Sequence, residues 1–259
     1  MPFMEDKITD GSFAGAISFI SDKAGDLSFG TTQINLTLAA NKNVNRENNL
    51  SVGIQGGFAQ RALKGDLEAQ QWDAEYNPNF SGGYLNDQVT GAGIENIGYG
   101  DFAAGMHWNY DGVPIRANAG LSLFHLNKPR HSIKGADEKL NAKLAFHGGA
   151  DIEINQELVR FIPQFLFLKQ GPQIETNIGG MVKYRLQEAS IYTGELREIS
   201  VYLGGWYRIG DAFIPTLRID FLSIIVGLSY DITISDINVA AESRGGMEVS
   251  VTYLHPFPP

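Results

Sequence analysis

The residues of this 259-residue chain that could carry out catalysis are few, and two acids are the best placed among them. Asp151 and Glu153 lie two positions apart, so in a strand they would share one face at about 7 Å, from a rise of ~3.4 Å per residue. Paired carboxylates at this separation could serve glycoside hydrolysis. We favour a simpler interpretation, in which both acids are solvated or paired with Lys143.

Other catalytic and metal-binding motifs are absent from the sequence. The five histidines show neither HExxH nor the spacing of metal ligands, and the lack of cysteine excludes disulfides and thiolate zinc sites. No G-x-S-x-G elbow occurs, and the glycine-rich stretch 91–98 lacks the spacing of a dinucleotide fingerprint. We therefore expect a protein that is not an enzyme, with no catalytic residues, no metal and no cofactor.

Charge and hydropathy narrow the class of protein further. The formal net charge is −9 and the basic residues are scattered, which argues against a nucleic-acid partner. Mean hydropathy is −0.13, and no run approaches the ~20 apolar residues that a spanning helix requires. These values also fit an outer-membrane barrel. Along each of its strands, apolar lipid-facing residues alternate with polar lumen-facing residues, so the mean hydropathy of the strand is close to neutral.

Apolar and polar residues alternate with a period of two along most of the chain, and this pattern predicts an all-β fold. In 101–111, for example, apolar and polar residues oppose each other: Phe102, Met106 and Trp108 against Asp101, His107 and Asn109. The segments are longer than the ~5–6 residues of an average soluble strand and suit the ~9–11 of a membrane strand. About twelve strands are expected, at 11–20, 27–43, 49–63, 99–111, 114–127, 140–155, 158–168, 173–187, 199–209, 212–221, 223–233 and 245–254.

The lengths of the connections predict the topology. Every second connection is tight, except 188–198, and the other set contains the long stretches 64–98, 128–139 and 234–244. Outer-membrane barrels place short turns in the periplasm and long loops outside. We therefore predict one antiparallel transmembrane β-barrel domain over 1–259, in the bacterial outer membrane, with both termini periplasmic.

The polar sides of these strands give the candidate site residues. The expected lumen-facing candidates are Asp101, His107, Asn109, Lys143, His147, Asp151, Glu153, Arg218 and Asp220. The charges are of both signs, unlike the single-sign ring of an ion-selective pore. Either they pair across a narrow lumen and fill it, or they only solvate the interior.

Several stretches, in order along nearly the whole chain, resemble the PorP/SprF family of outer-membrane proteins of type IX secretion and gliding. They are SDKAG at 21–25, TTQINL at 31–36, LSVGIQGGF at 50–58, PRH at 129–131, YRIGDA at 207–212, GLSYDI at 227–232 and GGMEVS at 245–250. Members of this family usually begin with a signal peptide and about two further strands. The resemblance therefore implies a fourteen-stranded barrel whose first hairpin and signal peptide precede Met1.

The resemblance also implies partners and a function. The expected partners are outer-membrane lipids and either a secreted adhesin or motility protein or other components of type IX secretion. The barrel would help to export that protein or hold it at the surface. Two alternatives stay open: a porin-like diffusion or uptake channel, and a soluble β-rich binding module.

Overall fold

A computed structural model describes residues 2–3, 11–24, 29–62, 96–131, 138–155, 158–187, 199–235 and 245–254, and all regular structure in these ranges is β-strand. Twelve strands have seven or more residues: β2 (Gly11–Ala24), β3 (Phe29–Asn43), β4 (Asn48–Ala62), β5 (Ile97–Asp111), β6 (Ile115–Phe124), β7 (Lys143–Asn155), β8 (Val159–Gln170), β9 (Gln173–Gln187), β10 (Ile199–Arg208), β11 (Ala212–Phe221), β12 (Ile224–Tyr230) and β14 (Met247–Tyr253). The other two, β1 (Pro2–Phe3) and β13 (Ile232–Thr233), have two residues each.

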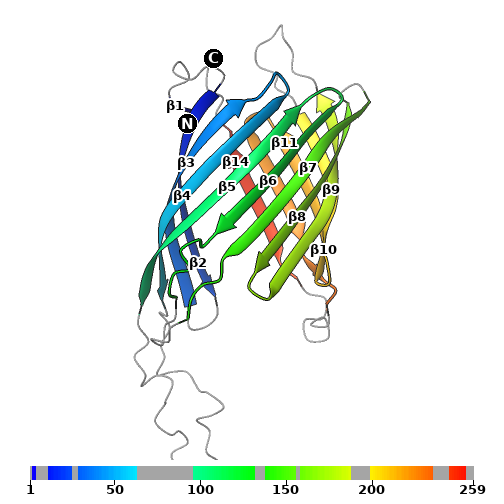
Figure 1. The fold of residues 1–259 in the computed structure, drawn as a ribbon. Coiled ribbons are helices and arrows are strands. Elements are labelled where there is room, and N and C mark those ends of the chain that lie inside the picture. The colour runs from blue at the N-terminus through cyan, green and yellow to red at the C-terminus, as the bar shows by residue number, and fades with distance from the viewer. Residues whose placement is uncertain are drawn as a thin grey trace, which may run out of the picture. The chain divides into compact units, whose positions relative to one another are not determined.

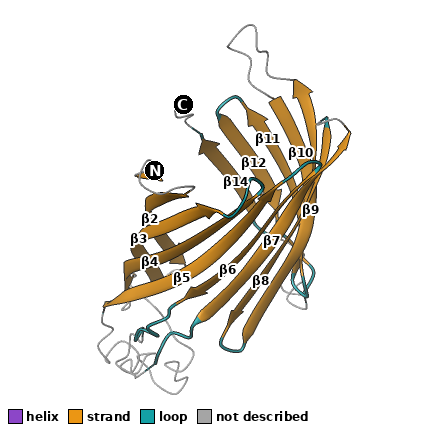
Figure 2. Ribbon diagram, turned by 45° about the horizontal axis from the view of Figure 1, so that its top comes forward, coloured by secondary structure: helices purple, strands orange, loops and turns teal. Residues whose placement is uncertain are grey.

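The strands form one sheet whose order follows the chain, from β1 to β12 and then β14, while β13 pairs with β11 (Figure 1). Tight turns set the register where strands follow each other closely. Gln170 pairs with Gln173 between β8 and β9, and Phe221 pairs with Ile224 between β11 and β12. Figure 2 shows the same succession of strands joined by turns. The predicted fold class is confirmed: all-β, with long antiparallel strands of the kind that form transmembrane barrels.

In the described part of the chain, no helix is both long enough and apolar enough to cross a membrane.

Contacts between Cα atoms divide the chain into two compact units. Unit 1 comprises Met1–Asn41, Val52–Gly105 and Leu123–Lys143, and unit 2 comprises Lys42–Ser51, Met106–Ser122 and Leu144–Pro259.

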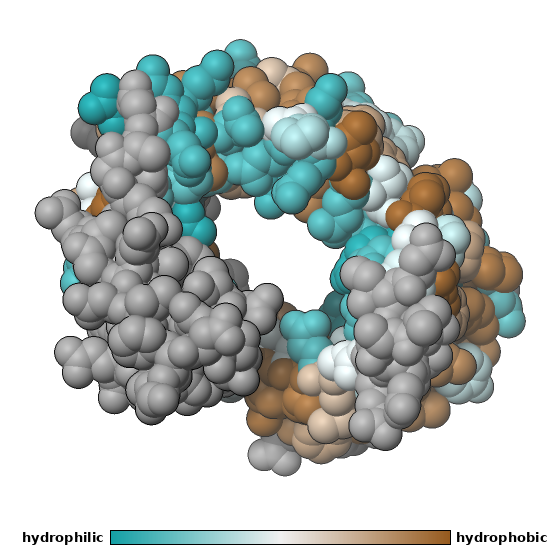
Figure 3. Space-filling view, turned by 90° about the horizontal axis from the view of Figure 1, so that it is seen from below, coloured by the Kyte–Doolittle hydropathy of each residue, from teal (hydrophilic) through white to brown (hydrophobic). Residues whose placement is uncertain are grey.

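Within each unit the burial pattern is the reverse of that in a soluble domain. The buried hydrophobic residues described are five alanines and Tyr202, whereas Met106 is 54% exposed and Leu203 is 67% exposed. Buried polar residues accompany them: Asn35, Asp101, Arg160 and Ser200. Figure 3 shows hydrophobic residues (brown) and hydrophilic residues (teal) of the described strands on opposite sides of the sheet. An exposed apolar side suits contact with lipid.

Most of the predicted strands differ from the structure by a few residues at one or both ends, and two of these differences have a local cause. The strand expected at 140–155 begins only at Lys143, because the preceding residues pair with the segment after β6: Arg130 bridges Lys139, and the Leu140 amide donates to the Pro129 carbonyl. The strand expected at 223–233 ends at Tyr230 and resumes as β13 in the same register on β11. The break lies near Pro215 of β11, which has no amide hydrogen for the ladder.

The strand expected at 11–20 continues to Ala24. Other expectations fall partly or wholly outside the described residues. Most of the predicted loop 64–98, all of 188–198 and the histidine at 255 lie outside the ranges that the structure describes.

Candidate functional site

The nine polar residues singled out by the sequence all lie on strands and are all buried or half-buried. Asp101, His107 and Asn109 belong to β5, Lys143, His147, Asp151 and Glu153 to β7, and Arg218 and Asp220 to β11. On each of these strands the large apolar residues at the alternate positions face the other way. We call the side that carries these nine residues the polar face, and the opposite side the apolar face.

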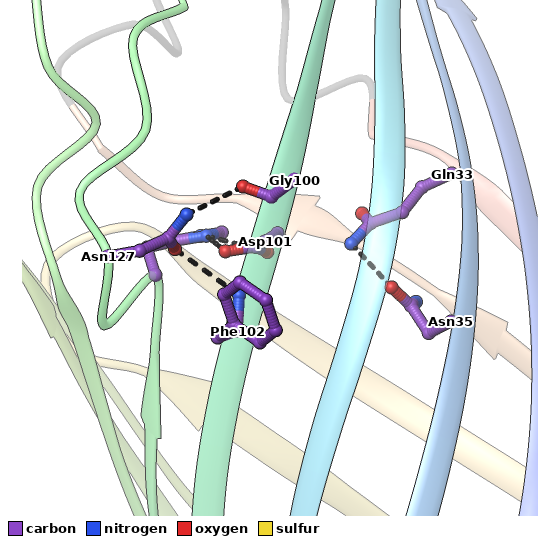
Figure 4. Close-up of polar contacts among 7 residues, drawn as sticks. Gln33, Asn35, Gly100, Asp101, Phe102 and Asn127 are labelled. Carbon is purple, nitrogen blue, oxygen red and sulfur yellow. Dashed lines mark hydrogen bonds and ion pairs between the residues drawn. The ribbon is translucent and has the colours of Figure 1, made fainter.

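In unit 1, Asp101 binds the segment that follows β6. Both carboxylate oxygens of Asp101 lie 2.9 Å from Nδ1 of His125, which has a positive φ of 57°. Two residues on, the Asn127 side chain donates to the Gly100 carbonyl at 2.7 Å and accepts from the Phe102 amide at 3.3 Å (Figure 4). Asp101 is therefore a buried carboxylate that holds a loop against β5.

A second polar contact in unit 1 joins three strands. Asn35 of β3 donates to Ser18 of β2 at 3.2 Å. It accepts from Gln33 at 2.8 Å (Figure 4). Gly57 of β4 leaves the space that the Asn35 side chain occupies, since a Cβ on Gly57 would lie 2.0 Å from Asn35 Oδ1. Satisfied polar groups of this kind fix the register of neighbouring strands.

In unit 2, the polar face carries two arginine–aspartate pairs. Arg160 of β8, only 8% exposed, donates from Nε to Asp151 of β7 at 2.6 Å. Arg218 of β11 donates from two nitrogens to both oxygens of Asp220, each at 2.7 Å. Such charge-assisted bonds are stronger than neutral ones and restrict the geometry of the side chains.

The partner of Asp151 differs from the expected one. Lys143 and Asp151 are eight residues apart on β7, which is about 27 Å at ~3.4 Å per residue. Arg160 lies on the next strand, after a short connection, and so reaches the carboxylate directly. The cation that holds Asp151 is therefore Arg160, and not Lys143, which was one of the two expectations for this acid.

An aromatic ring lies between two cations on the same face. Tyr202 of β10 is opposite Lys183 of β9 on one side and Arg218 of β11 on the other. The Lys183 ammonium lies 5.6 Å and the Arg218 guanidinium carbon 4.5 Å from the ring centroid. Cations at these distances are attracted by the π-electrons of the ring. Tyr202 therefore links three strands of unit 2.

Two histidines lie together above a glycine in unit 2. The rings of His107 on β5 and His147 on β7 are 5.5 Å apart between centroids and nearly parallel, at 24°. Gly120 of the intervening β6 makes room for them, since a Cβ there would lie 2.3 Å from His147 Cε1 and 2.9 Å from His107 Nδ1. Nε2 of His107 lies 3.0 Å from Asn109 Oδ1.

His147 also lines a pocket of about 450 Å³ in unit 2. The other lining residues come from β6 to β11: Asn118, Gly148, Gln164, Phe165, Leu166, Asn177, Trp206, Arg208 and Ile214. Beside the pocket, Arg208 donates to Asp211 at 2.9 Å and to Asp231 at 3.2 Å. The pocket therefore combines apolar walls with amide, imidazole and guanidinium groups.

Three residues of the polar face could not be singled out from the sequence, because the alternation over 158–168 and 199–208 is irregular: Arg160, Tyr202 and Arg208. The tight turn between β8 and β9 is a signal that could have placed two of them. It fixes Arg160 opposite Lys183, and Tyr202 follows from the next pairing. In the described ranges, no group of three or more His, Cys, Asp or Glu residues is arranged to hold a metal ion.

The sequence is similar to one family over nearly its whole length. A family model described as "Type IX secretion system membrane protein PorP/SprF" matches residues 3–253. No curated protein matches the sequence. Among solved structures, the chain is similar to BamA from Haemophilus ducreyi lacking POTRA domains 1–3, with a TM-score of 0.49 and 13% identity. The similarity covers 96% of this chain but only 60% of that one.

Proposed function

Because this chain belongs to the PorP/SprF family of type IX secretion system membrane proteins, we propose that it lies in the outer membrane and helps to export a secreted adhesin or motility protein or to hold it at the cell surface. The observation that carries the proposal is the two-sided sheet. Its apolar face is exposed and suits lipid, while its polar face carries paired charges rather than a catalytic arrangement.

The orientation that we propose places the end with the turns 44–47, 112–114 and 222–223 in the periplasm and the end with the long connections 64–98, 128–139 and 234–244 outside. Strand β6 separates the two ends clearly. The turn before it contains Val113, which is 89% exposed, and the segment after it contains the exposed Asn127. Components of the secretion system would then meet the Val113 end, and a secreted partner would meet the Asn127 end.

Site-specific photo-crosslinking in the native cells tests the proposal. A benzophenone amino acid at Val113 should capture periplasmic secretion components, and the same group at Asn127 should capture a secreted surface protein. A third variant with the group at Leu203, on the apolar face, is the matched control and should capture neither. Deletion of the gene should reduce surface display of the captured protein, and unchanged display would contradict the proposed function.

A further inference from the structure

We propose that His107 and His147 form a binding site for a transition-metal ion that prefers imidazole ligands, such as Zn²⁺, Cu²⁺ or Ni²⁺. The two rings come from β5 and β7, which are separated by β6 in the sheet. They meet only because Gly120, between them, has no side chain. An alanine or any larger residue at 120 would occupy the space that the rings share.

The nitrogens that would bind the ion face a common space. The position of a Cβ on Gly120 would be 2.5 Å from His147 Nε2 and 2.9 Å from His107 Nδ1, so both nitrogens border the gap above this glycine. Zinc binds imidazole nitrogen at about 2.0–2.1 Å. The proposed ion would lie in this gap, bound by Nε2 of His147 and Nδ1 of His107.

The hydrogen bond of His107 supports the same assignment. Nε2 of His107 lies 3.0 Å from Asn109 Oδ1, and a hydrogen on Nε2 would let this nitrogen donate to the amide oxygen and would leave Nδ1 to bind the ion. Metal-binding histidines almost always donate from their other nitrogen in this way, which fixes the tautomer and the ring orientation. Asn109 is thus a positioning residue for the proposed site.

The proposed ion would take its remaining ligands from the pocket beside His147. His147 lines the pocket of about 450 Å³, together with the amides Asn118 and Gln164. Water and amide oxygens there supply further ligands to an ion held by two imidazoles. Imidazole suits zinc, copper and nickel, whereas magnesium and calcium prefer oxygen ligands. The site would therefore bind a zinc, copper or nickel ion that exchanges with ions in solution. The bound ion would link β5 to β7.

Calorimetric titration with ZnCl₂ of the full chain in detergent, and electron paramagnetic resonance with CuSO₄, test this proposal. The wild-type protein should bind one ion, and the copper spectrum should show coupling to two imidazole nitrogens. His107→Ala and His147→Ala should each weaken binding by about tenfold or more, and Asn109→Ala by about tenfold, the lower end of the loss seen for such supporting residues.

The decisive variant is Gly120→Ala, which keeps both histidines but fills the space between them. It should abolish the two-nitrogen copper spectrum. Gly100→Ala is the matched control, because its Cβ would meet nothing closer than the Gly57 carbonyl oxygen at 3.9 Å. His131→Ala, outside the pair, should also leave binding unchanged. A zinc affinity unaltered in both His107→Ala and His147→Ala, or a two-nitrogen spectrum that persists in Gly120→Ala, would overturn the proposal.

Discussion

Two arginine–aspartate pairs of nearly equal length show how surroundings set the energy of an ion pair. The Arg160–Asp151 pair is 2.6 Å long with side chains 10% and 31% exposed, and the Arg116–Asp111 pair is 2.7 Å long with side chains 57% and 72% exposed. Water solvates both charges of the exposed pair whether or not they meet. Removal of Arg160 instead leaves a partly buried carboxylate without its cation.

We therefore expect Arg160→Leu to lower the free energy of unfolding by about 3 kcal/mol and Arg116→Leu by less than about 1 kcal/mol. Urea unfolding in lipid vesicles measures both. The double variant Arg160→Leu/Asp151→Leu should recover most of the loss, because it removes the uncompensated charge as well. Equal losses from the two single variants would contradict this account of the polar face.

Gly57 allows a second prediction about single residues, in unit 1. A Cβ at this position would lie 2.0 Å from Asn35 Oδ1 and 2.7 Å from the Ile34 carbonyl oxygen, and the latter belongs to the backbone and cannot rotate away. Gly57→Ala should therefore destabilise the protein by about 1–3 kcal/mol, as overpacked positions do. Gly100→Ala is the control, and it should change stability much less in the same unfolding measurement.

At the scale of elements, strand β5 tests the assignment of the two faces. Met106 is 54% exposed and lies on the apolar face, and Asn109 is half-buried on the polar face. If the apolar face meets lipid, Met106→Arg should cost about 2–4 kcal/mol near the bilayer midplane. Asn109→Arg should cost much less, because its side chain meets the polar face. Folding titrations in vesicles measure the free-energy cost of each substitution. Equal costs would contradict the assignment of the two faces.

The strands could be predicted well from the sequence because each carries its own alternation. Strands β9 and β11 have the expected bounds, and the other long strands differ by at most a few residues. The start of β7 illustrates the remaining errors. The residues before Lys143 read as strand, but their hydrogen bonds go to the segment 129–131, and no local pattern encodes that choice.

The contacts of the candidate site were less predictable, since they depend on register between strands. Asp151 was recognised as a polar residue, but its partner Arg160 lies on another strand. The pair of His107 and His147 was missed for the same reason. Forty residues separate them in sequence, and the signal that unites them is a glycine on the strand between.

At the scale of the whole molecule, the proposed orientation can be tested with cysteine labelling, because the chain has no cysteine of its own. Val113→Cys and Lys128→Cys place one thiol at each end of β6, both at exposed positions. A maleimide that cannot cross membranes should label Lys128→Cys on intact cells and Val113→Cys only after the outer membrane is opened. Labelling of Val113→Cys on intact cells would invert the proposed orientation.

The charges of the polar face also predict how the whole protein behaves in a bilayer. Ion-selective pores present rings of one sign to the passing ion. In unit 2 the opposite charges of Asp151 and Arg160, and of Arg218 and Asp220, instead bind each other. Tyr202 lies between Lys183 and Arg218, so a bulky ring occupies the same face. A face of this kind offers ions neither a uniform field nor freely solvated charges.

We therefore expect the protein reconstituted in planar bilayers, without its partner, to conduct poorly and without ion selectivity. Tyr202→Ala and Arg160→Ala/Asp151→Ala remove bulk and paired charge from the polar face, and each should raise the conductance of single insertions above that of the wild type. The exposed pair provides the control, and Arg116→Ala/Asp111→Ala should leave the conductance unchanged. Large, steady currents from the wild-type protein would contradict the expectation and favour a diffusion channel, because they require a continuous water-filled path that paired side chains do not block.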